Sequence, residues 1–154
     1  QIKTIETAIK ELIDKDPDIG ERVKNITKIK GVSLVTAATV IAETNGFENF
    51  ENYKQLTSYA GLDVVLNSSG KHEGKSRISK KGNSHIRSGL FMPSVAIVRF
   101  NKELGAVYRR LVHKGKNGKV ALMAVVRKTL ILIYTLWKKN CPYNPNYRPE
   151  VKPA

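Results

Sequence analysis

The sequence predicts a mainly α-helical domain with a helix-hairpin-helix-like N-terminal part, a long basic loop and a long C-terminal core helix. Apolar residues recur at three- and four-residue spacing over most of the chain, as they do on one face of an α-helix. Capping residues precede several of these segments. The one stretch with strand character is short, at residues 63–66. With 154 residues, of which 41% are hydrophobic, the chain can bury one core.

The N-terminal part is predicted to form four helices. Apolar residues from Ile2 to Ile13 define the first, which ends near Pro17. The second covers about residues 19–28. Ser33 is a favourable N-cap for the third, over residues 34–44. Asn49 is expected to cap the fourth, which ends at Gly61 and carries Phe50, Tyr53, Leu56, Tyr59 and Ala60.

The helical period disappears between residues 62 and 82, where Gly, Ser, Asn and Lys accumulate, and returns at Asn83. We therefore expect a long loop followed by a helix over residues 83–100, with a kink at Pro93. The expected core positions of this helix are Ile86, Leu90, Val95 and Ile97.

Two further helices are predicted, over residues 101–113 and 120–139. The second is the longest and most apolar, so we expect it to lie at the centre of the core. Arg127 and Lys128 interrupt it before it reaches membrane-spanning length, so no membrane partner is expected. The lone Cys141 excludes an internal disulfide and fits a cytoplasmic protein.

We expect one compact unit with three parts. Residues 1–66 form the helical part, residues 67–140 the basic serine loop and helical core, and residues 141–154 an extended proline-rich tail. Because Gln1 opens directly into a helical pattern, we expect the chain to begin within a longer protein.

Positive charge is concentrated in the second part of the chain. Residues 1–66 have 8 Lys and Arg against 10 Asp and Glu, whereas residues 67–154 have 19 against 3. The whole chain has a formal charge of +14. A field of this sign attracts polyanions, and nucleic-acid phosphates are the expected partner.

The turn between the second and third helices resembles a helix-hairpin-helix motif. In such a motif a glycine lets backbone N–H groups approach a DNA phosphate at a helix N-terminus. Here Lys30 and Gly31 are the candidate DNA-binding residues. A second interpretation is that Gly31 only makes a tight turn between packed helices.

The loop after Leu62 combines a serine doublet, Ser68 and Ser69, with basic side chains. A hydroxyl among cations could attack a phosphodiester, because the cations stabilise the charge that gathers on the phosphate oxygens. Without further information such a Ser-Ser-Gly string is more typical of a turn. The candidate phosphate-binding residues are Lys71, Lys75, Arg77, Lys80, Lys81, Asn83 and Arg87.

The order of these segments resembles the IS110/IS116/IS902 family of insertion-sequence transposases. The resemblance rests on Gly31 and its helix, Gly61-Leu62, the Ser-Ser-Gly loop, the run from Arg77 to Asn83, Arg87 and the long helix after Lys119. It covers the family's C-terminal domain, from about residue 23 to residue 145.

The resemblance implies DNA transposition by strand exchange, with a serine that becomes covalently joined to DNA. On the family's pattern Ser69 is the expected nucleophile and Ser68 the alternative. It also implies a bridge RNA that guides target choice, a homo-oligomer, and an N-terminal RuvC-like domain whose four acidic residues bind Mg²⁺. That domain is absent from this sequence, so we expect the fragment alone to have little or no activity.

The histidines and acidic residues of the second part are too scattered for a metal site, so no metal is expected in this chain. A different class of function stays open: a noncatalytic helix-hairpin-helix module that binds nucleic acid, in which the serines only shape a loop. Both interpretations predict salt-dependent binding, and a covalent protein–DNA adduct distinguishes them.

Overall fold

The computed structural model describes residues 1–65, 68–70, 72–73 and 77–147, with the backbone alone for Ser68, Ser69, His72 and Glu73. These residues are mainly helical, as predicted. The helices are α1 (Ile2–Asp14), α2 (Pro17–Thr27), α3 (Leu34–Glu43), α4 (Tyr53–Tyr59), α5 (Ser84–Phe100), α6 (Lys102–His113) and α7 (Gly118–Lys139). The strands are β1 (Val64–Val65), β2 (Ser68–Ser69), β3 (His72–Glu73) and β4 (Arg77–Ile78).

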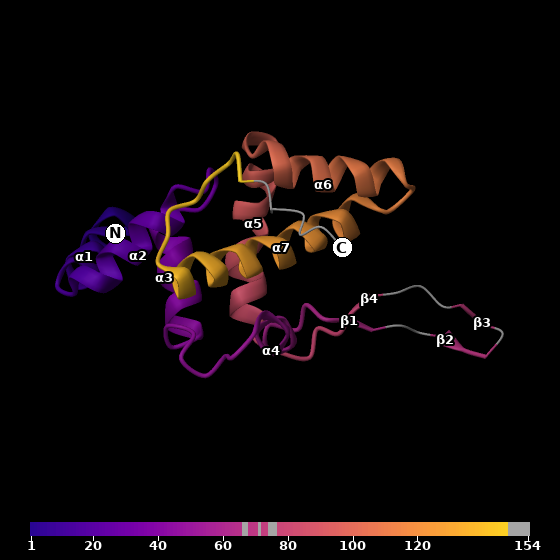
Figure 1. Cartoon of the computed structure of the whole chain (residues 1–154), viewed down its shortest axis with the longest axis horizontal. Coiled ribbons are helices and arrows are strands. Elements are labelled where there is room, and N and C mark those ends of the chain that lie inside the picture. The colour runs from indigo at the N-terminus through magenta and orange to yellow at the C-terminus, as the bar shows by residue number, and fades with distance from the viewer. Residues whose placement is uncertain (66–67, 71, 74–76, 148–154) are drawn as a thin grey trace, which may run out of the picture.

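Helix α7 is the central element of the core (Figure 1) and packs against α2, α4, α5 and α6. Its buried side chains include Val125, Leu130, Ile133 and Trp137. The expectation that Arg127 and Lys128 interrupt α7 before it reaches membrane-spanning length is wrong, because by length and composition α7 would suit a membrane. Its most apolar stretch has a mean hydropathy of 1.7, but 56% of that stretch is buried inside the protein. The prediction of a central core helix is confirmed.

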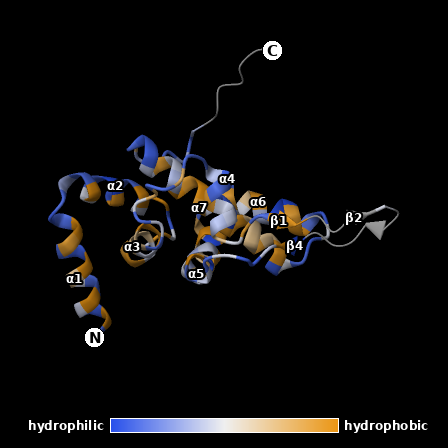
Figure 2. Cartoon of the chain, turned by 90° about the horizontal axis from the view of Figure 1, so that it is seen from below, coloured by the Kyte–Doolittle hydropathy of each residue, from blue (hydrophilic) through white to orange (hydrophobic). Residues whose placement is uncertain are grey.

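The N-terminal helices begin where their capping residues place them. Asp16 caps α2 by accepting hydrogen bonds from Asp18 N and Ile19 N, and Ser33 caps α3 by accepting one from Thr36 N. Helix α1 forms as predicted, yet none of its residues is buried. Its apolar residues alternate with polar ones and lie at the outer end of the molecule (Figure 2).

The prediction that Asn49 caps the fourth helix is wrong. Helix α4 begins at Tyr53, and Asn52 caps it by accepting from Lys54 N and Gln55 N. Before it, Asn45, Gly46 and Phe47 all have positive φ, at 48°, 62° and 60°. This turn buries Phe47 completely, and the centroid of its ring lies 5.5 Å from that of Tyr134 and 6.0 Å from that of Trp137. Phe50 therefore precedes α4 instead of belonging to it.

Helix α5 buries Ile86, Leu90 and Ile97 as predicted, but Val95 is 43% exposed. At 3.6 residues per turn a position nine residues after Ile86 lies on the opposite side of the helix. Ser94 takes the inward position instead. The helix continues through Pro93 without an interruption.

Candidate functional site

The predicted long loop is a β-hairpin that projects from the helical body (Figure 1). Strand β1 pairs antiparallel with β4 at its base, and β2 pairs with β3 farther out. Ser69 lies opposite His72, so the backbone of the serine doublet directly precedes the hairpin turn. Gly70 has a φ of +59° there, a conformation that glycine adopts easily.

The base of the hairpin is closed by hydrogen bonds between its two arms. Ser79 N donates to Asp63 O over 2.9 Å, and Lys80 N donates to Gly61 O over 3.0 Å. The Ser79 hydroxyl also donates to the Asp63 carboxylate, with the two oxygens 2.5 Å apart. These bonds fix the direction in which the hairpin leaves the body.

Gly61 and Gly82 allow the chain segment before β1 and the segment after β4 to make backbone contact next to these bonds. Gly61 has a φ of +68°. A Cβ at Gly82 would collide with Tyr59 O and lie 2.6 Å from Gly61 N. Asn83 N donates to Tyr59 O over 2.7 Å at the same place. The two chain segments are in backbone contact, so neither glycine position has room for a side chain.

Arg87, a predicted phosphate-binding residue, binds the protein's own backbone at this contact. Its Nη1 donates to Ala60 O over 2.9 Å and to Gly82 O over 3.3 Å. The side chain is half-buried. Arg87 therefore fastens the chain segment before the hairpin to the segment after it, and its binding to phosphate stays a prediction.

Asn83 uses both ends of its side-chain amide within the protein. Its Oδ1 accepts from Ile86 N over 3.1 Å and caps α5, while its Nδ2 donates to the Glu43 carboxylate over 2.7 Å. Tyr59 OH lies 3.3 Å from the same nitrogen and donates to Glu43 O. Asn83 thus joins the start of α5 to the end of α3 and to α4.

Replacement of Asn83 by alanine is expected to lower the free energy of unfolding by about 1–3 kcal/mol, because a helix cap and a hydrogen bond to a carboxylate are both lost. Urea denaturation measures this change in the free energy of unfolding. Asn52→Ala is the matched control, since Asn52 caps α4 through two backbone N–H groups of the same helix. An Asn83→Ala variant no less stable than Asn52→Ala would contradict the joining role.

Three other predicted phosphate-binding residues surround this base and are exposed: Arg77, Lys80 and Lys81. Lys80 has a φ of +54°, so the backbone turns sharply at this point. Within the described part of the chain the one ion pair joins Arg22 to Asp18, at the other end of the molecule. The cations around the hairpin base are thus not neutralised by an ion pair with a described acidic residue.

Lys30 and Gly31 lie elsewhere. Gly31 has a φ of +103°, and a Cβ there would be 2.7 Å from Ile97 Cγ1 and 3.0 Å from Ile97 N. The glycine therefore lets the turn between α2 and α3 pack closely on α5. Measured along the axis of α5, Ile97 lies about 15 Å from Arg87. Lys30 is exposed, and phosphate binding by this turn stays a prediction.

Some predicted site residues lie outside the described residues. Lys71 and Lys75 are among them, as are the side chains of Ser68 and Ser69. Among the residues that are described, no three His, Cys, Asp or Glu gather as metal ligands. The prediction of a chain without its own metal stays untested.

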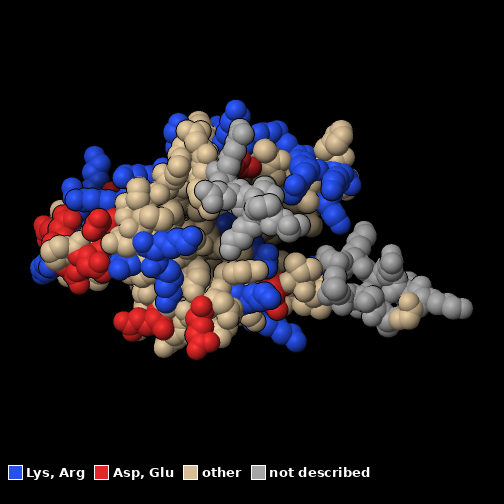
Figure 3. Space-filling model, viewed as in Figure 1, with Lys and Arg blue, Asp and Glu red and all other residues tan. Residues whose placement is uncertain are grey.

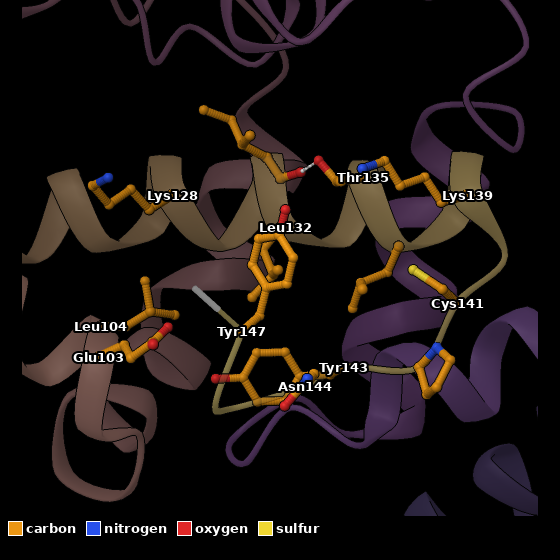
Figure 4. Close-up of a pocket in the computed structure, with 13 residues that line it drawn as sticks. Glu103, Leu104, Lys128, Leu132, Thr135, Lys139, Cys141, Tyr143, Asn144 and Tyr147 are labelled. Carbon is orange, nitrogen blue, oxygen red and sulfur yellow. Dashed lines mark hydrogen bonds between the residues drawn. The ribbon is translucent and has the colours of Figure 1, made fainter. Parts of the chain in front are cut away.

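A groove of about 370 Å³ lies between α6, α7 and the chain that follows α7. Figure 4 shows Leu104 and Leu132 in it, together with Tyr143, Tyr147 and Cys141. None of the predicted site residues lines it. Tyr143 OH accepts a hydrogen bond from Asn101 Nδ2, which holds this part of the tail against α6.

Sequence reasoning missed the acceptors at the hairpin base, Glu43, Tyr59 and Asp63. Their partners are 16 to 40 residues away in the sequence, and no local pattern reveals such a pairing. Asn83 could have been identified as a cap from its position directly before a helix.

The candidate site lies within the part of the chain that matches a known family. Residues 23–109 match the transposase family IS116/IS110/IS902. The chain belongs to this transposase family. The matched part includes the serine hairpin, its base and all of α5, and it ends within α6.

Curated relatives of this transposase chain are considerably longer. The pilin gene-inverting protein of Moraxella bovis is 31% identical over 146 residues, which cover 93% of the chain and 45% of the relative. The transposase for insertion sequence element IS1111A of Coxiella burnetii is 27% identical over 149 residues, which cover 86% and 41%. The chain thus spans less than half the length of these relatives.

Proposed function

We propose that this chain is the DNA-binding, serine-bearing part of a transposase that moves DNA by strand exchange. The observation on which the proposal depends is the hairpin. It carries the backbone of Ser68 and Ser69 at its outer end, away from the helical core, and its base is surrounded by exposed Arg77, Lys80 and Lys81. Membership of a transposase family and the names of its relatives support a role in DNA transposition.

In the proposed reaction the Ser69 hydroxyl oxygen attacks a DNA phosphorus atom. A bond forms between Oγ and phosphorus while the bond from phosphorus to a sugar oxygen breaks. The hydroxyl proton ends on the departing sugar oxygen. The reverse step, with a sugar hydroxyl from another strand as attacking group, releases the serine and joins the new strands. Because one phosphate ester replaces another, the exchange consumes no cofactor.

The basic residues would bind the phosphates beside the reacting bond and stabilise the charge on the attacked group. We further propose that Mg²⁺ belongs to acidic residues of an N-terminal domain outside this chain. A guide RNA, a homo-oligomeric assembly and a cytoplasmic location complete the proposal and rest on the family resemblance.

A covalent adduct tests this function. The complete transposase is incubated with labelled DNA that has the ends of its insertion element and is then denatured in detergent. We expect a protein–DNA species that survives the detergent and disappears after protease treatment. If the protein catalyses strand exchange while no such species forms at any time, the serine mechanism is wrong.

A further inference from the structure

A second basic surface lies on the hairpin formed by α6 and α7, and the proposed function does not use it. We define the α6–α7 basic surface by six exposed cations: Lys102, Arg109, Arg110, Lys114, Lys116 and Lys119. Figure 3 shows positive side chains gathered near the turn between α6 and α7. The family match ends at residue 109, so most of this surface lies beyond it.

The exposed cations of α6 lie away from its buried leucine. Leu104 is buried, whereas Lys102, Arg109 and Arg110 are exposed. Lys102 and Arg109 are seven residues apart, so they lie on nearly the same side of the helix and about 10 Å apart along its axis. That distance is about three base-pair steps of B-DNA.

The turn between the two helices holds the next cations in a defined backbone. Lys116 N donates to Leu111 O over 3.0 Å, and Gly115 has a φ of +85°, the pattern of a Schellman C-cap. Asn117 then caps α7 by accepting from Lys119 N over 2.9 Å. A fixed backbone lowers the entropy lost when a ligand binds.

The charge of this surface is almost uncompensated. Glu103 is the one acidic residue in the sequence from residue 77 to residue 147. It is exposed on α6 and forms no ion pair with a described residue. An array of cations with so little neutralising charge attracts a polyanion.

The surface also lies at the same end of the molecule as the serine hairpin. In Figure 1 the turn between α6 and α7 and the hairpin both point away from α1, and Figure 2 shows them at this same end after a quarter turn. An extended ligand that reaches the hairpin from this end can therefore also meet α6.

We propose that the α6–α7 basic surface binds the sugar-phosphate backbone of duplex DNA next to the segment that the serine hairpin engages. Lys and Arg contacts to phosphates position a duplex without reading its sequence. The proposal rests on the proposed function for the choice of DNA, and it assigns no reacting group to this surface.

The test compares two triple variants of the 154-residue chain. One is Arg109→Gln/Arg110→Gln/Lys116→Gln. The control, Lys3→Gln/Lys10→Gln/Lys15→Gln, removes the same charge from exposed positions at the α1 end. Binding of a random-sequence DNA duplex of about 30 base pairs is measured over a range of salt concentrations. Melting temperatures verify that both variants are folded.

Each lost phosphate contact reduces the slope of log K against log salt by about 0.9. We therefore expect the first variant to lose about 2.7 from the slope and on the order of 100-fold in affinity at about 0.1 M salt. The control variant at the α1 end should lose less of the slope and less of the DNA affinity. Equal losses in the two variants, or unchanged DNA affinity in the first, would overturn the proposal.

An RNA duplex of the same sequence is the second probe. A loss confined to the RNA would overturn the assignment to DNA. Adduct formation in the complete transposase provides an independent readout, because a wrong assignment of this surface leaves the serine adduct in place. Conversely, if the serine mechanism is wrong and no adduct forms, the triple variant of the α6–α7 basic surface can still reduce the slope of log K against log salt.

Discussion

Replacement of Ser69 by alanine in the complete transposase is expected to reduce strand exchange by about 10⁴-fold or more, because the proposed mechanism then lacks its nucleophile and the covalent route is lost. The covalent protein–DNA species should disappear as well. DNA affinity should change little, since the removed hydroxyl has no charge and the phosphate contacts remain. Strand exchange is measured with DNA that has the ends of the insertion element.

Two serine variants serve as controls. Ser68→Ala changes the other member of the doublet. Since one hydroxyl alone forms the bond to phosphorus in the proposed reaction, we expect the two replacements to differ strongly in effect. Ser88→Ala removes an exposed hydroxyl that donates to Ser84 O within α5 and should leave exchange unchanged. Wild-type exchange by the Ser69→Ala variant would exclude Ser69 as the nucleophile.

The replacement Gly82→Ala is expected to destabilise the chain by about 1–3 kcal/mol or more, the usual cost of forcing an extra group into a packed contact. The added Cβ would collide with Tyr59 O and approach Gly61 N to 2.6 Å. Both are backbone atoms, so a side-chain rotation cannot relieve the contact. In the complete transposase the displaced hairpin should also lower strand exchange.

Gly20→Ala is the matched control for this variant. Gly20 lies inside α2, where a Cβ would meet Ile13 O at an ordinary 3.6 Å. Alanine favours a helix over glycine by about 1 kcal/mol, so this change should be neutral or stabilising. Urea denaturation compares the two variants. A Gly82→Ala chain as stable as the Gly20→Ala chain would show that the hairpin base does not need its close backbone contact.

Helix periodicity and capping residues were sufficient to predict most of the fold. The predicted cap Ser33 lies directly before α3, where a short polar side chain satisfies free N–H groups. The prediction that Asn49 caps the fourth helix is wrong because three consecutive residues with positive φ turn the chain before α4, and Asn52 then caps that helix. Phe47 is one of these three residues, and a bulky residue rarely adopts that conformation. Burial of the Phe47 side chain offsets the cost of this conformation, and the local sequence does not reveal that burial.

The candidate site was predictable as a set of motifs but not as a structure. Gly61 and Gly82 of the Lys-Lys-Gly-Asn run are 21 residues apart in the sequence, yet they form one backbone contact. Strands of two residues have no detectable alternation, so the hairpin was expected as a loop. The prediction of phosphate binding rests on the place of Asn83 before a helix and, for Arg87, on its charge and the family's pattern. In the structure they also hydrogen-bond to Glu43, Ala60 and Gly82, which only the fold brings near.

Identification of the DNA-linked amino acid tests the central claim most directly. The adduct formed by the complete transposase is digested with nuclease and protease, and the peptide that retains a nucleotide is sequenced by mass spectrometry. We predict that the nucleotide is attached to Ser69. Attachment to a tyrosine such as Tyr143, or to any residue outside the serine doublet, would contradict the proposed role of the hairpin.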